Sequence, residues 1–164
     1  MGYALEAVIA PTALLSPFGS DLVGAGTVAL GHGLVLLPVT EKLARADDRA
    51  ADHPAGFVRL TAPLVERAAA WSRRGPVAYV EAEFFGGWGT QAAVVWHRGA
   101  PVLGPLRQEE GEPAPEEGTP ISRALRHLGV ATGPDDRDEF DAVGLGAHRS
   151  TEGWALRATP LEAP

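Results

Sequence analysis

The sequence predicts a single α+β domain, with an antiparallel sheet flanked by a few short helices. Two observations carry this prediction: a pair of β-rich runs that form a central hairpin over residues 76–98, and several short segments with helical apolar spacing. A chain of 164 residues is long enough to bury its own hydrophobic core. We therefore expect residues 1–164 to form one domain.

The hairpin is the clearest element of the sequence. Pro76–Phe85 and Gln91–Arg98 are rich in β-branched and aromatic residues, and glycines dominate residues 86–90 between them, which we expect to form a loop. Side chains alternate along a strand, so the first run should present one face with Val77, Tyr79, Glu81 and Glu83. A third strand is expected over 101–106.

Strands are also expected in the N-terminal part. Residues 3–10 are rich in apolar side chains, and residues 27–37 contain two apolar runs divided by the glycines on either side of His32. Interior glycine often marks a bulge or a break, so 27–37 predicts either two short strands or one bulged strand. The prolines between residues 11 and 20 predict a loop.

Helices are indicated by capping residues as well as by apolar spacing. Thr40, Thr61 and Thr119 suit the N-cap position, and Gly75 stands where a left-handed residue would end the second helix. Five short helices are expected, over 40–45, 61–74, 119–128, 135–143 and from Ser150 or Thr151 onward.

Three segments are expected to lie outside the packed elements. Residues 107–118 hold five glutamates, two prolines and two glycines, which is typical of a flexible acidic loop. The polar stretch 47–53 should be solvated, and residues 159–164 should form a frayed C-terminus.

The charge of the chain is negative and unevenly distributed. The net charge is −7; residues 1–82 hold eight acidic and seven basic residues, whereas 83–164 hold thirteen acidic and seven basic residues. Contacts to phosphate need lysine and arginine, so we expect no nucleic-acid partner. The acidic C-terminal half instead favours a basic protein partner.

Several classes of site are not expected. The chain has no cysteine, which excludes disulfides, thiolate metal sites and cysteine nucleophiles. No phosphate-binding fingerprint is present, so no cofactor is expected. No apolar stretch suits a membrane helix and the first residues do not resemble a signal peptide, so we expect a cytoplasmic protein with no membrane partner. No metal site is expected, because metal-ligand spacing is missing among the five histidines, which are His32, His53, His97, His127 and His148.

Glu81 and Glu83 are the best catalytic candidates. Alternation places their carboxylates on one strand face, separated by a rise of about 6.7 Å. Paired carboxyl groups perform acid–base chemistry in glycoside hydrolases, although two acids on the solvent face of a strand give the same pattern. A small hydrolase is therefore one alternative function.

Partner-binding candidates lie in two places. Trp88 sits within the glycine-rich stretch, where it either anchors a partner or folds back onto the protein. The densest acidic patch does not fit the spacing of a calcium loop, and it indicates either a solvated helix N-terminus or a docking patch for a basic partner. It comprises Asp135, Asp136, Asp138, Glu139 and Asp141.

Three blocks carry a resemblance to a known kind of protein: Tyr79–Trp96, Ile121–Val130 and Asp138–Gly146. They resemble blocks of small bacterial, actinobacterial-like proteins, some of which are similar to immunity proteins that neutralise a toxin made by the same cell. The resemblance covers residues 76–154 and implies no catalytic residue. It implies a cytoplasmic protein-binding module, specifically an immunity-type inhibitor of a basic toxin. The remaining alternative is a structural subunit of a larger assembly. The sequence predicts no oligomeric state.

Overall fold

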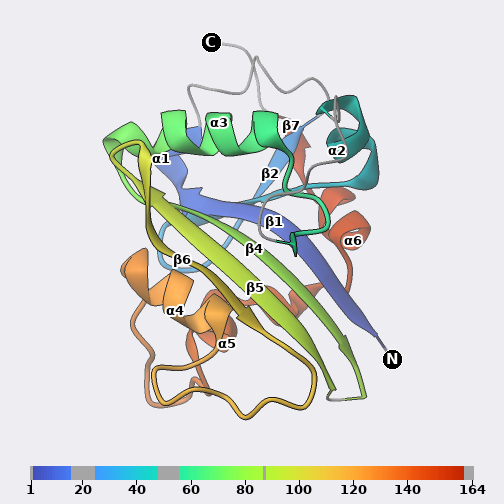
Figure 1. Cartoon of the computed structure of the whole chain (residues 1–164), viewed down its shortest axis with the longest axis vertical. Helices are drawn as coiled ribbons and strands as arrows, with labels where there is room; N and C mark the ends of the chain where they lie inside the picture. Colours follow the sequence, from blue (N-terminus) through green and yellow to red (C-terminus); the bar gives the residue numbers. More distant parts are fainter. Residues whose placement is uncertain (1, 16–24, 48–55, 87, 161–164) are drawn as a thin grey trace.

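The computed structural model describes residues 2–15, 25–47, 56–86 and 88–160, with the backbone alone for 45–47. Within these ranges the chain forms one antiparallel sheet of seven strands in the order β6-β5-β4-β1-β3-β2-β7, with helices on both of its faces (Figure 1). This confirms the predicted α+β class. The strands are β1 (Tyr3–Pro11), β2 (Gly26–Ala29), β3 (Leu34–Pro38), β4 (Val77–Phe85), β5 (Trp88–His97), β6 (Ala100–Gln108) and β7 (Thr159–Pro160).

The central strands are buried on both faces of the sheet. Along β4, every residue from Val77 to Ala82 is buried, and alternate side chains enter two separate apolar clusters. Tyr79 belongs to the cluster beneath the N-terminal helices, whereas Val80 belongs to the cluster beneath the C-terminal ones. Burial of apolar surface on both sides of the sheet is the main stabilising term in such an architecture.

Four of the predicted N-caps are confirmed. The side chains of Thr40, Thr61, Thr119 and Ser150 each accept a hydrogen bond from a backbone N–H in the first turn of a helix. The helices are α1 (Thr12–Leu15), α2 (Glu41–Asp47), α3 (Ala62–Trp71), α4 (Pro120–His127), α5 (Glu139–Val143) and α6 (Thr151–Ala155), with 3-10 turns η3 (Ser72–Arg74) and η4 (Leu145–Ala147). No helix in the described ranges has the length and apolarity that crossing a membrane requires.

The hairpin is tighter than predicted. β4 ends at Phe85 and β5 begins at Trp88, so the five-residue loop expected over 86–90 was wrong: Gly89 and Thr90 already pair with β4. Gly89 lies so close to β4 that an added Cβ atom would meet the Glu83 carbonyl oxygen at 1.8 Å. The glycine that suggested a loop is therefore a residue whose missing side chain lets the two strands approach.

Other boundaries also differ from the sequence prediction. Gly75 is extended rather than left-handed, because α3 ends at Trp71 and continues as a 3-10 turn. The predicted loop over 11–20 contains α1. For 27–37, the first of the two predicted alternatives is confirmed, because β2 and β3 are separate strands.

The segments expected outside the packed elements are partly ordered. Residues 107 and 108 belong to β6, and Thr159–Pro160, which we expected in a frayed end, pair with β2 as β7. Residues 48–53 of the polar stretch, together with 161–164, lie outside the described residues.

We expect Gly89→Ala to lower the free energy of unfolding by about 1–3 kcal/mol, because the strands must separate to admit the methyl group. Urea unfolding followed by circular dichroism measures this loss. Gly146→Ala is the matched control, since nothing lies within 4 Å of a Cβ built there. Equal midpoints for the two variants would contradict the close approach of β5 to β4.

Candidate functional site

One face of the sheet is covered at one end and open at the other. α3 crosses this face near the end remote from the hairpin tip, and the tip of the β4–β5 hairpin extends away from it (Figure 1). On β4 the side chains of Tyr79 and Glu81 are buried, whereas those of Glu83 and Phe85 on the same face are exposed. The open part of the face therefore begins just beyond Glu81.

Glu81 marks this boundary through three hydrogen bonds. The backbone N–H of Val58 donates to its Oε1 at 2.7 Å, that of Arg59 to its Oε2 at 2.8 Å, and the Tyr79 hydroxyl to its Oε2 at 2.6 Å. A buried carboxylate is tolerated when such donors replace its hydration. The side chain of Glu81 thereby fixes the segment before α3 against the sheet.

Arg59 extends the same network to distant parts of the chain. One guanidinium nitrogen, Nη1, lies 3.1 Å from the Val39 carbonyl oxygen and 3.2 Å from carboxylate oxygens of both Glu6 and Glu152. The Thr151 hydroxyl donates to the Glu6 carboxylate and accepts from the Glu6 backbone N–H at 2.9 Å. This polar cluster ties β1, the segment before α3 and α6 together.

Two groups of this network, Tyr79 and Glu6, have raised pKa values. Burial raises the pKa of Tyr79 well above its ordinary value, and the Glu81 carboxylate raises it further, so Tyr79 stays a hydrogen-bond donor. Burial also raises the pKa of Glu6, although the Thr151 hydroxyl and the Arg59 guanidinium oppose that effect. Both shifts reflect a site shielded from water.

The two catalytic candidates share a face as alternation predicts, but their environments differ. Glu81 is 8% exposed and its carboxylate accepts all three bonds described above, whereas Glu83 is exposed. The hollow that both residues line, with a volume of about 40 Å³, is far below the roughly 300–1,000 Å³ of small-molecule sites. The geometry favours a structural role for Glu81, and hydrolysis stays a prediction.

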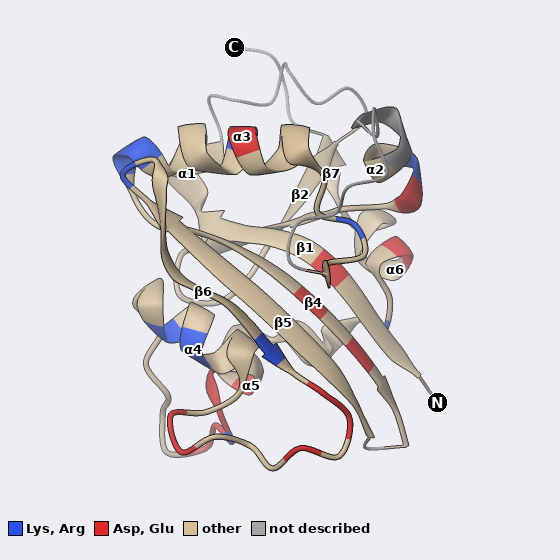
Figure 2. Ribbon diagram, viewed as in Figure 1, with Lys and Arg blue, Asp and Glu red and all other residues tan. Residues whose placement is uncertain are grey.

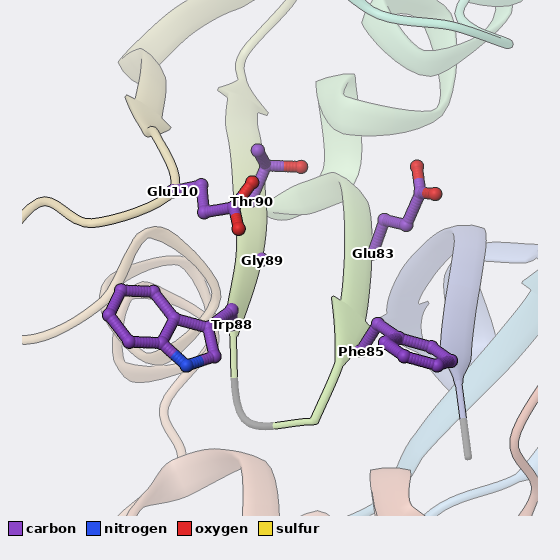
Figure 3. Close-up of a pocket in the computed structure, with 6 residues that line it drawn as sticks. All are labelled: Glu83, Phe85, Trp88, Gly89, Thr90 and Glu110. Carbon is purple, nitrogen blue, oxygen red and sulfur yellow. The ribbon is translucent and has the colours of Figure 1, made fainter.

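A larger hollow, of about 460 Å³, opens at the hairpin tip. Trp88 and Phe85 are directly opposite each other in the strand register, and they expose 62% and 75% of their surface. Figure 3 shows the two rings on opposite strands at the tip, with the carboxylates of Glu83 and Glu110 farther from the turn. The lining consists of Glu83, Phe85, Trp88, Gly89, Thr90 and Glu110.

Trp88 also borders a second hollow, of about 410 Å³, between β5 and the turn that follows β6. Glu109 and Glu112 line this hollow together with Gln91 and Gln108. Trp88 therefore lines two hollows, and each of them is also lined by glutamates.

The hairpin hollow is negatively charged. Neither Glu83 nor Glu110 forms an ion pair with any residue in the described part of the chain, and the lining contains no lysine or arginine. Arg107, near the end of β6, pairs with the Glu109 carboxylate and donates to the Gly56 carbonyl oxygen at 3.3 Å. Figure 2 shows acidic residues along the loop that follows β6. Two carboxylates thus remain beside two exposed aromatic rings.

The acidic patch predicted from the sequence is used mostly for local structure. Asp136, Asp138 and Asp141 each accept a hydrogen bond from a backbone N–H three or four residues away. Glu139 pairs with an arginine of α4 at 3.1 Å, which leaves Asp135 as the exposed acid with no such bond. The patch lies at the N-terminus of α5. Val143 of this helix packs on the face of the sheet opposite to the hairpin hollow.

Metal and cofactor sites were not expected, and the described residues contain no group of three or more histidines, aspartates and glutamates that could hold a metal ion. His32, His97, His127 and His148 lie in separate elements or turns, and His53 is outside the described residues. No protein-family model, curated protein or solved structure matches this chain. The resemblance to immunity proteins therefore stays a prediction.

Sequence reasoning singled out Trp88 and, as a catalytic candidate, Glu83, but it missed Phe85, Thr90 and Glu110 as residues of the same hollow. Phe85 and Thr90 could have been identified from the sequence. A two-residue hairpin turn would pair residue 85 with 88 and 83 with 90, which is the register that the structure has. Glu110 had no comparable signal, since it lies in a separate segment that tertiary structure brings to the hollow.

We expect Glu81→Gln to lower the free energy of unfolding by about 1–3 kcal/mol, because an amide NH₂ would face a backbone N–H or the Tyr79 hydroxyl. Glu83→Gln on the same strand face should leave it within about 0.5 kcal/mol of the parent. Urea unfolding of both variants measures the difference. Equal stability of the two would mean that the bonds to Glu81 do not secure the segment before α3.

We expect Glu6 to make stability fall as pH rises. Its folded pKa lies above the ordinary value of 4.5, so the folded protein binds the proton more tightly than the unfolded chain and loses that advantage as Glu6 ionises. Relative to Glu6→Gln, the parent should be most stable below pH 4.5 and lose that advantage as the pH rises through and above 4.5. Urea unfolding below and above that pH measures the difference; a constant one would refute the shift.

Proposed function

We propose that this protein is a protein-binding module that engages a basic partner through the hairpin hollow. The observation that carries the proposal is the pair of exposed rings, Phe85 and Trp88, beside the carboxylates of Glu83 and Glu110, which form no ion pair with the residues that the structure describes. Large exposed apolar side chains gathered at one place are typical of interaction sites, and tryptophan is among the residues that contribute most to binding energy.

Charge supports a basic partner. The chain carries a net charge of −7, and acidic residues line both hollows that adjoin Trp88. Opposite charge speeds the encounter of two proteins and disfavours acidic competitors. An immunity-type inhibitor of a basic toxin in the cytoplasm is the specific form of this function that we propose, because inhibition by occlusion needs a binding face and no catalytic group.

The hollow requires no cofactor for this role. Its polar groups are two carboxylates and the Thr90 hydroxyl, which accept hydrogen bonds from a cationic partner group. Its apolar groups are aromatic rings on paired strands, which lose little conformational freedom on binding. Both properties suit recognition of a protein surface.

We expect affinity purification from native cell extract at low salt to retain a basic protein in stoichiometric amount, released as salt is raised. Phe85→Ser combined with Trp88→Ser should abolish its retention, because the anchors of the interface are gone. Mass spectrometry of the eluates identifies and quantifies the partner.

Leu156→Ser is the control for this experiment, because Leu156 is 87% exposed yet lies outside the hollow. It should retain as much partner as the parent protein. Retention by the Phe85/Trp88 double variant equal to that by the parent would contradict the proposed binding face.

A further inference from the structure

We propose that the hairpin hollow binds an arginine side chain of the partner, stacked on Trp88 and paired with Glu83 and Glu110. This inference rests on the proposed function and names the group that the site recognises. It follows from the lining of the hollow, which combines exposed aromatic surface with carboxylates that no residue of the described ranges pairs with.

The indole of Trp88 provides the stacking surface. It is 62% exposed, whereas Trp71, Trp96 and Trp154 are each 3% exposed or less. The negative face of an aromatic ring attracts cations, tryptophan most strongly, and the planar guanidinium of arginine stacks on it while its edge stays free for hydrogen bonds.

The carboxylates supply the acceptors for that edge. Glu83 on β4 and Glu110 after β6 approach the hollow from two different segments, and the Thr90 hydroxyl lies opposite Glu83 in the register. A guanidinium offers five N–H donors in a plane, enough to reach carboxylates on more than one side. An ammonium group has a compact, strongly hydrated charge and gains less from the ring.

Within the part of the chain that the structure describes, no lysine or arginine lines this site. Arg107, which lines the neighbouring smaller hollow, is engaged by Glu109 and by the Gly56 carbonyl oxygen. The rings, in turn, project from paired strands: Phe85 pairs with Trp88 in the register, and Gly89 packs against the β4 backbone. A preformed site loses less ordering entropy when its ligand arrives.

The experiment uses three flexible glycine–serine peptides that carry a neutral fluorophore and differ only in their spaced test residues: arginine, lysine or citrulline. Fluorescence anisotropy at low salt measures their affinity for the full chain. We expect the arginine peptide to bind severalfold more tightly than the lysine peptide, and the citrulline peptide, which is neutral, not to bind measurably. Equal affinity for arginine and citrulline peptides would overturn the inference.

Variants locate the binding. Trp88→Leu should lower the affinity for the arginine peptide by about three- to thirtyfold, and so should the double variant Glu83→Gln with Glu110→Gln. Glu66→Gln with Asp135→Asn removes the same charge from exposed positions outside the hollow and should change affinity less than about twofold. Circular dichroism confirms that each variant is folded.

The outcomes separate this inference from the proposed function. If the control double variant lowered the affinity for the arginine peptide as much as the Glu83 and Glu110 double variant did, the attraction would be diffuse. That outcome would refute the arginine site. If the purified partner required Trp88 while no arginine peptide bound, the binding face would stand and its recognition of arginine would be wrong.

Discussion

The buried carboxylate of Glu81 is the interaction that organises one whole face of this protein. A charge in that position requires donors, and the donors come from the segment before α3 and from Tyr79. Because that segment is held there, the covered part of the face ends at Glu81 and the rest of β4 and β5 remains open. The same bonds that secure the fold therefore define the edge of the open face, where we propose that a partner binds.

The roles of the acidic residues follow from the donors near each of them. Asp138 and its neighbours accept bonds from the first turn of α5 or the loop before it, so most of their charge serves local structure. Glu6 and Glu81 serve the tertiary network around Arg59. Glu83 and Glu110 have neither kind of partner in the described chain, and for this reason they are acids at the hairpin hollow that remain available to another molecule. Acidic density in the sequence alone does not separate these cases.

The sequence predicts the local features well and the long-range ones poorly. Alternation predicts that Glu81 and Glu83 share a face, and capping threonines predict where α3 and α4 begin. It cannot tell that one glutamate is buried and the other exposed, since the difference arises from backbone groups about twenty residues away. The hairpin loop was predicted too long because Gly89 resembles a loop residue, whereas its role is to let two strands pack closely.

An exposed aromatic pair also suits self-association, but the negative charge of the chain disfavours contact between two copies at the rings. A second copy would bring another net charge of −7 and a second set of carboxylates to face Glu83 and Glu110. Like charges brought together at an interface are destabilising, and more so when water is excluded. Under the proposed function, the acidic residues at the hairpin hollow therefore disfavour contact of the rings with a second copy and favour a cationic partner. The same carboxylates would then give both selectivity against self-association and affinity for a basic surface.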